Sequence, residues 1–527
     1  MVSNYRLKLR WLIVLATIIR CIFAYFLELG NDEVYYFTYA EFLDWNHFDH
    51  PPMVGLLIRF FTLNLHWVSD FSVRLGAIFL AAFNTWLIAS LVKYLMSERA
   101  ALIVAILYTA SIYSSIISGL FILPDSIAST FWLASLYSMV IIIKSENSIE
   151  RTNQFLLLGL LIGLAMLSKV HSIFLWFGFL GYIFFYHKKI LEYKALYLSI
   201  LISIIFILPI WLWNEEYNYI TWKFHGNRIS IIGSEIRWDY FLQTLFGQIL
   251  YNNPLLIYLY SVVLVYLVKD KYKINGISSN IIYLLLFCSF PIMLVSTGLA
   301  LFRQILPHWS GAGFFGLMII SSAWIDSKLD LNLTPKCRKI LNIQLVFTLS
   351  ILILTFIIIK WYPGNLVVSS NKKELGKGDI TLDLIGWKDL EKQFREVRTE
   401  DLKNNFMHPE DALLVNNWFP AGHLYYYVAK PLGMRLIAEG RLVDIHKFAW
   451  INLSFDPIQK GENAYYISAS NMLKEPEEIY GKYFEHIEFR KVLVQERSGK
   501  EVRLWYIYHL KKAKQVIGNK HPLNYSE

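Results

Sequence analysis

Acidic and basic side chains occur at a few points where long apolar stretches of the sequence are interrupted. Asp32 and Glu33 follow the first apolar stretch, Asp125 precedes a later one, and Lys169 follows another. His50 stands before two prolines in the first interruption. A carboxylate can take a proton from a hydroxyl group, and a cation can stabilise a leaving group that gains negative charge. The interruptions therefore offer both kinds of group that a displacement reaction needs.

The apolar stretches are the elements that must position these groups. Runs of roughly 17–25 apolar residues bounded by charges, proline or glycine are typical of membrane-spanning helices. Eleven runs near this length, some of them shorter and one longer, are present: Trp11–Leu29, Val73–Leu95, Ala100–Ser118, Ile127–Ile143, Phe155–Leu167, His171–Tyr186, Ala195–Trp213, Phe241–Val268, Ile281–Leu301, Trp309–Ile325 and Ile340–Ile359. The sequence therefore predicts a polytopic α-helical membrane protein with about eleven transmembrane helices.

The distribution of Lys and Arg predicts the orientation of these helices. The first run follows Arg6, Lys8 and Arg10 and has no small-residue cleavage site, so it is expected to remain as an anchor with a cytoplasmic N-terminus. Threading eleven spans from that start places seventeen Lys and Arg residues on the cytoplasmic side and eight on the opposite side. Positive residues accumulate on the cytoplasmic side of membrane proteins. The odd number of spans puts the C-terminus outside a plasma (inner) membrane.

The composition divides the chain into a membrane part and a soluble tail. The whole chain is 55% hydrophobic and 17% charged, which disfavours a soluble enzyme. Residues 1–360 hold 26 Lys and Arg and 19 Asp and Glu, whereas the shorter segment 361–527 holds 24 and 22. We therefore expect a transmembrane domain over residues 1–360 and an extracytoplasmic soluble domain over residues 361–527. The tail contains no cysteine, so neither a disulfide framework nor a Cys-based zinc site is expected there.

The tail is expected to be a small α/β domain. Short β-branched and aromatic runs predict strands at Leu413–Asn416, Arg435–Ala438, Tyr465–Ala469 and Glu501–His509. A helix is predicted near Ala421–Ala429 between the first two strands.

The longest outer loops are Gly30–Phe71 and Asn214–Tyr240. The first contains an aromatic stretch, Val34–Phe42, whose composition predicts an amphipathic helix on the membrane surface. Asn31, Asp32 and Glu33 at its start also fit an N-cap with two acids that complement the helix dipole. The capping role and a chemical role are compatible with each other.

These groups resemble, in type and order, the motifs of a known enzyme class. An acidic pair after the first span, followed by Tyr35-Tyr36 and by His50-Pro51-Pro52, is similar to the first outer loop of C-type glycosyltransferases. Further similarities are Leu123-Pro124-Asp125, Ser168-Lys169 and Leu306-Pro307-His308-Trp309 at later outer turns. The resemblance is closest to the protein O-mannosyltransferases and the bacterial lipid A aminoarabinose transferases, and it covers the membrane part up to about Ile325.

The resemblance implies transfer of a sugar from a polyprenyl-phosphate donor to an acceptor on the outer face of the membrane. The acceptor class stays open between lipid A, another glycan and a protein. Displacement at the anomeric carbon needs a carboxylate that takes the proton of the acceptor hydroxyl. Asp32 is the expected base, and its neighbour Glu33 is the alternative. Asp125 is expected to orient the sugar or the acceptor, although a turn or N-cap role fits it equally well.

The leaving phosphate is expected to meet basic side chains at the outer turns. The candidates are His50, Lys169, Arg228, Arg303 and His308. His50 replaces the lysine that precedes the proline pair in aminoarabinose transferases, so its charge depends on pH. An unpaired intramembrane charge costs about 2.5–3.5 kcal/mol, so Lys169 is expected to have a partner. Each candidate also has a purely structural alternative. These are snorkelling at a span end for Lys169 and Arg303, a solvated loop position for Arg228 and an interfacial position for His308.

Two other classes of function compete with a transferase. A transporter or flippase is expected to carry internal repeats and broken spans at matching places, and the sequence contains neither. A structural or sensory role would not explain why the basic and acidic residues lie together on one side of the membrane. No cofactor is required by these motifs, and a divalent cation is not indicated because Asp32 and Glu33 alone make a weak cation site. The net charge of +9 is sorted by membrane side, so nucleic acid is not an expected partner.

Overall fold

The structure, a computed structural model, describes residues 4–329, 334–369 and 371–525. The chain forms two compact units. The first unit holds most of the chain up to Leu352. The second holds Phe26–Phe42, His47–Asp49 and the chain from Ile353 onward. Parts of the first outer loop therefore belong to the same unit as the tail.

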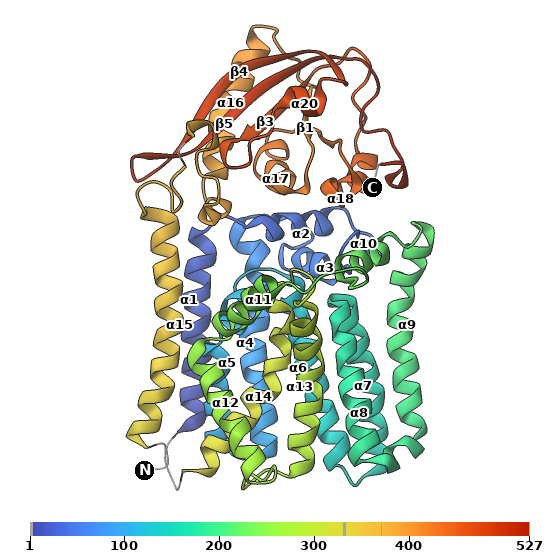
Figure 1. Cartoon of the computed structure of the whole chain (residues 1–527), viewed down its shortest axis with the longest axis vertical. Helices are drawn as coiled ribbons and strands as arrows, with labels where there is room; N and C mark the ends of the chain where they lie inside the picture. The colour runs from blue at the N-terminus through green and yellow to red at the C-terminus, as the bar shows by residue number, and fades with distance from the viewer. Residues whose placement is uncertain (1–3, 330–333, 370, 526–527) are drawn as a thin grey trace. The chain divides into compact units, whose positions relative to one another are not determined.

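The first unit is built from helices, most of which run roughly parallel to one another (Figure 1). Its α-helices are α1 (Tyr5–Phe26), α3 (Met53–Phe61), α4 (Asp70–Leu95), α5 (Glu98–Ala110), α6 (Pro124–Lys144), α7 (Ser148–Ser168), α8 (Phe174–Tyr186), α9 (Lys194–Glu216), α10 (Ile220–Ile229), α11 (Trp238–Tyr251), α12 (Pro254–Lys269), α13 (Ser279–Leu299), α14 (Phe314–Ser327) and α15 (Pro335–Trp361), of which α1 and α15 end in the second unit. Shorter turns are the π-helix η1 (Tyr113–Ile117) and the 3-10 helices η2 (Val170–Ile173), η3 (Lys188–Glu192) and η4 (Pro307–Gly313).

Small residues let some of these helices approach closely. A Cβ atom on Gly159 of α7 would lie 2.3 Å from the backbone oxygen of Ser199 on α9. A Cβ atom on Gly178 of α8 would lie 2.4 Å from the backbone oxygen of Phe287 on α13. Close backbone approach at small residues is a common way to pack helices in membranes, because lipid offers no hydrophobic drive for association.

The apolar runs all coincide with helices, but fewer of these helices are long enough to span a membrane alone. Among the described residues, seven helices have the length and apolar composition of a span: α1, α4, α6, α7, α9, α13 and α15. The predicted run Phe241–Val268 is two helices, α11 and α12, bent by 97° at a break, and counting this pair as one span gives eight. The break lies at Asn252, Asn253 and Pro254, where Pro254 has no backbone N–H to continue the helix. The count of eleven spans stays a prediction.

One charged side chain, Arg20, lies within the apolar sequence of α1. Arg20 of α1 is buried, and its guanidinium donates hydrogen bonds to the backbone oxygen and the hydroxyl of Ser115 at 3.0 and 3.1 Å. Ser115 lies in the π-helix η1, where the i to i+5 pattern leaves some carbonyl groups without their usual helical partner. The arginine is therefore satisfied inside the helical bundle.

The second unit combines one helix of the first outer loop with a small sheet domain. Its helices are α2 (Asn31–Glu41), α16 (Trp387–Lys403), α17 (Trp418–His423), α18 (Leu442–Ile445), α19 (Phe448–Ile451) and α20 (Pro476–Tyr480), with the π-helix η7 (Leu424–Ala429) and the 3-10 helices η5 (Lys372–Glu374), η6 (Ile380–Leu384), η8 (Asn452–Ser454), η9 (Ser470–Met472) and η10 (Pro522–Asn524). Its strands are β1 (Ala412–Val415), β2 (Leu436–Ala438), β3 (Ala464–Ala469), β4 (Phe484–Arg497) and β5 (Lys500–Ala513).

The five strands form one mixed sheet in the order β2-β1-β3-β5-β4. β1 pairs in parallel with β2 and β3, with Leu413 opposite both Leu436 and Tyr465. β5 pairs antiparallel with β3 and β4. The four strands predicted from the sequence match β1, β2, β3 and β5, and the predicted helix falls on α17 and η7. The edge strand β4 and the helix α16 are additional elements that the sequence patterns did not predict.

The aromatic helix α2 is present, but most of its length has no exposed side. Its residues from Glu33 to Ala40 are all buried in the protein. The hydroxyl groups of Tyr35 and Tyr39 both donate to Oδ1 of Asp49, at 2.8 and 2.6 Å. The expectation of an amphipathic helix on the membrane surface is therefore wrong for most of α2, because protein surrounds it.

Candidate active site

A buried ion pair joins two of the residues singled out in the sequence. Lys169 Nζ lies 2.8 Å from both carboxylate oxygens of Asp125, and the two side chains are 9% and 5% exposed. The hydroxyl of Tyr113 donates to Asp125 Oδ1 at 2.9 Å. Lys169 thus has the charged partner that its position within apolar sequence predicts. A pair this well buried is held by its mutual attraction and by its further hydrogen bonds.

Helix ends bring this pair together. Asp125 lies in the first turn of α6, which begins with Pro124 at a position where its missing N–H costs nothing. Lys169 follows the last residue of α7, Ser168, and precedes the 3-10 helix η2. Since α6 and α7 are antiparallel neighbours, the start of one and the end of the other meet at the same end of the bundle (Figure 1).

Aromatic and basic residues from three other segments surround this pair. The guanidinium of Arg228, on α10, lies 5.3 Å from the ring centre of Trp309. The ring of His171 lies 4.7 Å from the same Trp309 ring. The rings of His50 and His225 are 6.2 Å apart. Arg228 itself is exposed and the Trp309 ring is half-buried, so the charge of Arg228 remains available beside an aromatic ring.

His308 lies within electrostatic reach of the whole cluster. Burial lowers its pKa to about 4, while the charge of Asp125 raises it and the charges of Lys169, His50 and Arg228 lower it. His308 is therefore uncharged near neutral pH. It can donate or accept one hydrogen bond at each ring nitrogen, but it does not add a positive charge to the site.

Arg303 has a different environment. Its Nε donates to the backbone oxygen of Ser230, two residues after Arg228, at 2.6 Å. Five of the predicted residues form one group through their ion pair, ring contacts and charges, and Arg303 is joined to the segment that carries Arg228 by a backbone contact. The grouped residues are His50, Asp125, Lys169, Arg228 and His308.

The two acids of the first outer loop, Asp32 and Glu33, belong to the second unit and differ from each other. Glu33 is 2% exposed, and its Oε2 accepts the backbone N–H of Gly30 at 2.9 Å, as in a capping box. Asp32 precedes it in the first turn of α2 and is exposed. The capping role suggested by the sequence thus falls on Glu33.

The tail holds the segment that leads into α2. The backbone N–H of Leu29 donates to the hydroxyl of Tyr427 at 2.7 Å, and the backbone oxygen of Leu29 lies 2.9 Å from Nε2 of His423. The side-chain amide of Asn31 donates to Oδ2 of Asp383 at 2.9 Å. The backbone N–H of Trp387 donates to Oε2 of Glu28 at 2.8 Å. These contacts fix the position at which Asp32 emerges.

Asp383 is a second carboxyl group near Asp32. The pKa of Asp383 is raised to about 6, mainly by burial; the charges of Asp32 and Asp379 add to this rise, whereas Arg503 and the hydrogen bond from Asn31 oppose it. Arg503 is itself fully buried, with its guanidinium 4.6 Å from the ring centre of Trp387 and 4.1 Å from that of Trp505. Burial lowers the pKa of Arg503 to about 9.

Three contributors to these sites were missed in the sequence: Tyr113, Asp383 and His423. Tyr113 lies in an apolar run, and its bond to Asp125 depends on the π-helix that turns it toward α6. Asp383 and His423 lie in the tail, far along the chain from the acids of the first outer loop. His423 is buried, and that burial lowers its pKa to about 3.

Within residues 4–329, 334–369 and 371–525, no group of three or more His, Cys, Asp or Glu side chains is arranged to hold a metal ion.

Comparison with known proteins gives one match in sequence and several in structure. The family model of the dolichyl-phosphate-mannose-protein mannosyltransferases matches residues 49–213. No curated protein sequence matches the chain significantly. The matched segment includes His50, Asp125 and Lys169.

Two similar solved structures cover nearly the whole chain, and a third covers less than half of it. The crystal structure of ArnT from Cupriavidus metallidurans bound to undecaprenyl phosphate has a TM-score of 0.61 at 12% identity, covering 96% of this chain and 98% of that one. The apo structure of the same protein has a TM-score of 0.59 at 11% identity, covering 94% and 97%. The S. cerevisiae protein O-mannosyltransferase Pmt1-Pmt2 complex bound to the sugar donor is 21% identical over 43% of this chain and 34% of that chain, with a TM-score of 0.32. The chain thus has the fold of a C-type glycosyltransferase with a small C-terminal sheet domain, and it resembles the mannosyltransferase and aminoarabinose transferase families.

Proposed function

We propose that the protein transfers a sugar from a polyprenyl-phosphate donor to an acceptor on the outer face of the membrane. The fold it shares with ArnT of Cupriavidus metallidurans, whose structure contains undecaprenyl phosphate, supports this proposal. So does the sequence similarity to dolichyl-phosphate-mannose-protein mannosyltransferases. The observation that carries it is the buried pair of Lys169 and Asp125 with the exposed cation Arg228 nearby.

The proposed reaction is one displacement at the anomeric carbon of the donor sugar. The acceptor hydroxyl oxygen forms a bond to that carbon, and the bond between the carbon and the phosphate oxygen breaks. The electron pair of the broken bond leaves with polyprenyl phosphate, and the hydroxyl proton goes to a carboxylate base. Such a reaction needs a base and a positive environment for the phosphate.

Lys169 and Arg228 are the proposed cations for the phosphate. An ammonium group has three N–H donors, so Lys169 can bond to Asp125 and still donate to a phosphate oxygen. Asp125 cancels one positive charge, and His308 is neutral, so Arg228 leaves the cluster with a net positive charge. In this proposal Asp125 acts as a positioning residue for Lys169, and His308 and His50 supply further hydrogen bonds.

Asp32 is the proposed base. Both acids stand in the first turn of α2, but Glu33 is buried and bonds to the backbone of Gly30. A carboxylate committed to a cap is a poor proton acceptor for a substrate, whereas Asp32 is exposed. The contacts of Leu29 and Asn31 with the tail keep α2 in place within the second unit.

The orientation of the chain is part of the proposal. We infer that the loop between α12 and α13 is cytoplasmic and that the tail is outside. Introducing Asn275→Cys and Ser498→Cys separately into a Cys337→Ser background gives two probes for an impermeant thiol reagent in intact cells. Labelling at position 498 and none at position 275 is expected. Labelling at position 275 alone would show that the topology is the opposite one and that the candidate site faces the cytoplasm.

Binding of the donor's lipid phosphate tests the proposed function directly. Native mass spectrometry of the full chain in detergent micelles should detect a complex with undecaprenyl phosphate. Lys271→Met, which removes an exposed lysine at the start of the α12 to α13 loop, serves as a control that should bind like the wild type. Failure of the wild-type protein to bind any polyprenyl phosphate would overturn the proposal.

A further inference from the structure

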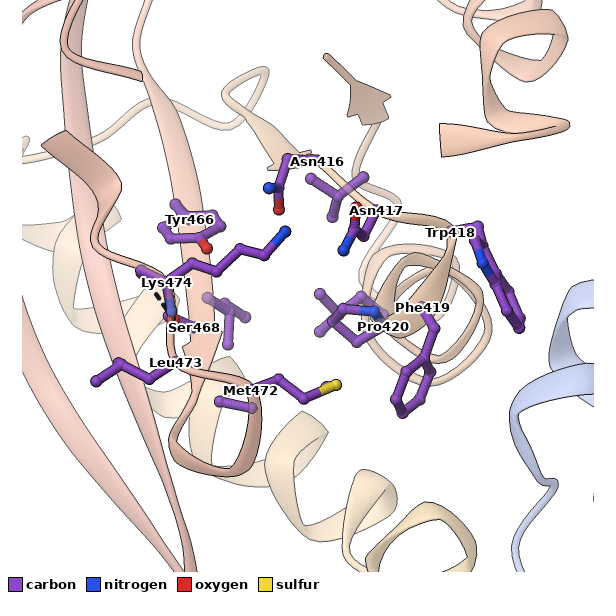
Figure 2. A pocket seen from close by; sticks show the side chains of 14 residues that line it. Asn416, Asn417, Trp418, Phe419, Pro420, Tyr466, Ser468, Met472, Leu473 and Lys474 are labelled. Atoms are coloured by element: carbon purple, nitrogen blue, oxygen red, sulfur yellow. Dashed lines mark hydrogen bonds between the residues drawn. The ribbon is translucent and has the colours of Figure 1, made fainter. Parts of the chain in front are cut away.

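The sheet of the second unit carries a cavity that the proposed reaction does not use. Its volume is about 410 Å³, within the range of roughly 300–1,000 Å³ that is typical of small-molecule sites. It is lined by the carboxyl ends of β1 and β3, by the start of α17 and by the segment that follows β3. Figure 2 shows its side chains gathered around an open centre.

The topology of the sheet explains why a cavity forms there. β1 and β3 are parallel neighbours, so their carboxyl ends lie at the same edge. From β1 the chain continues to β2 on one side, and from β3 it continues to β4 and β5 on the other side. Strands that part in opposite directions leave a crevice at their carboxyl ends, and open α/β sheets bind ligands at such switch points.

One positive charge points into this crevice. The side chain of Lys474 reaches across it, and its ammonium group faces Asn416 and Asn417 (Figure 2). With its amide oriented to satisfy both neighbours, Asn417 accepts from Lys474 Nζ at 2.9 Å and donates to the backbone oxygen of Asn416 at 2.9 Å. The ammonium therefore has a neutral partner and keeps further donors for a ligand.

No acid in the described part of the chain forms an ion pair with Lys474. The charges that act on it are those of Asp444 and Arg441, which have opposite effects on its pKa. These two form an ion pair with each other at 2.7 Å, so their fields largely cancel at Lys474. A cation without a counter-ion at a polar crevice is an incomplete anion site.

The remaining walls suit a small ring. Phe419, Pro420 and Met472 line one side of the crevice with apolar surface, and the ring of Trp418 is directed away from it (Figure 2). The amide of Asn416 lies on the polar side, and so does the hydroxyl of Ser468, which donates to the backbone oxygen of Lys474 at 3.1 Å. Amides and hydroxyl groups can bond to the hydroxyl groups of a sugar, and the apolar wall can contact the C–H face of its ring.

We propose that this crevice binds an acidic sugar unit, a single saccharide ring that carries a carboxylate or a phosphate. The anionic character rests on Lys474. The choice of a sugar rests on the proposed function, in which a sugar-containing donor or acceptor must reach the outer face. The site would hold such a unit through a charge-assisted hydrogen bond to Lys474 and neutral hydrogen bonds to Asn416 and Asn417.

Ligand-detected NMR with the full chain in detergent micelles tests this site. The probes are glucuronate and glucose 6-phosphate, with glucose as the neutral analogue of both. At least one acidic sugar should bind ten or more times more tightly than glucose. Lys474→Met should abolish that preference, Lys474→Arg should retain part of it, and Lys460→Met, at an exposed lysine outside the crevice, should behave like the wild type.

The outcomes separate the two proposals. Equal binding of glucose and both acidic sugars, no binding of either acid, or a normal preference in Lys474→Met would each overturn the acidic-sugar site. Binding of undecaprenyl phosphate to the same samples is measured in parallel. If undecaprenyl phosphate binds and the acidic sugars do not, only the crevice proposal fails. If the acidic sugars bind and undecaprenyl phosphate does not, the proposed function fails and the crevice proposal stands.

Discussion

The two units place their acidic groups in opposite electrostatic surroundings. In the first unit Asp125 is buried against the opposite charge of Lys169, with a further bond from Tyr113. In the second unit Asp383 is near the like charge of Asp32, and its pKa is raised to about 6 by burial and by that charge. The first arrangement fixes a cation in place, and the second disfavours a second negative charge.

This difference shows how acids of one type are given separate tasks. An acid whose charge is cancelled by a buried lysine is a structural counter-ion and a poor base. An acid at an exposed helix start, beside a partner that resists ionisation, remains available to a substrate. The predictions below test this division, from the largest expected effect to the smallest.

Replacing the exposed acid should have the largest effect on rate. Asp32→Asn removes the proposed base while keeping a residue that is well suited to a helix start. The release of polyprenyl phosphate from its sugar-linked form, extracted from cells, should slow by about 10²–10⁴-fold. Glu33→Gln is the matched control, because glutamine can also accept the backbone N–H in a capping box. Equal losses in the two variants would contradict the division between Asp32 and Glu33.

Breaking the buried pair should have the largest effect on stability. Lys169→Met leaves Asp125 as an uncompensated buried charge and should lower the free energy of unfolding by about 3–5 kcal/mol. The double variant Lys169→Met with Asp125→Asn removes both charges and should recover most of that stability, as measured by thermal unfolding in detergent. Undecaprenyl phosphate binding should stay weak in the double variant. If binding returned together with stability, Lys169 would have a structural role only.

The like-charge pair predicts a pH dependence of stability. The pKa of Asp383 in the folded state is about 6, above its ordinary value of 3.8, so the folded state binds this proton more tightly than the unfolded state. Its contribution to stability is therefore largest below about pH 4, falls as the pH rises to about 6 and is constant above that. Two pKa units correspond to at most about 3 kcal/mol.

Asp383→Asn should remove this dependence. The variant should make the second unit more stable than the wild type at pH 8 and leave its stability unchanged at pH 4, measured by hydrogen exchange of the tail. The asparagine can still accept the hydrogen bond from Asn31. A variant that is destabilised equally at both pH values would show that the carboxylate is favoured in the folded state.

The smallest expected effect distinguishes two arginines. Arg228→Ala should weaken binding of undecaprenyl phosphate about tenfold, which is the value of roughly one charge-assisted hydrogen bond. Arg303→Ala should change it less, because the Nε of Arg303 is already committed to the backbone oxygen of Ser230. A larger loss in Arg303→Ala than in Arg228→Ala would move the phosphate site toward Arg303.

Much of the fold could be predicted from apolar patterning. The predicted strands match β1, β2, β3 and β5 because buried strands are continuous apolar runs. The strand β4 lies at the sheet edge and carries many charged residues, so no apolar run marks it. The helix α16 was missed although Leu390, Phe394 and Val397 recur at helical spacing and are buried. Asn252, Asn253 and Pro254 are likewise a signal of the break between α11 and α12.

The candidate site could be predicted only in part. The cost of an unpaired intramembrane lysine correctly predicts that Lys169 has a partner, but the identity of that partner depends on how α6 and α7 meet. His308 can be singled out by its place before Trp309, whereas its neutral state comes from burial that no local pattern encodes. Asp383 contacts Asn31 only because the chain returns to the first outer loop after the last span.

Mass spectrometry of envelope glycolipids and glycoproteins, from cells with and without this protein, tests the central proposal most directly. We expect that at least one glycolipid or glycoprotein loses the mass of a single sugar unit when the protein is absent. Reintroducing the wild-type protein should restore that mass, and Asp32→Asn, at equal abundance in the membrane, should not. Identical spectra with and without the protein, or full restoration by Asp32→Asn, would contradict it.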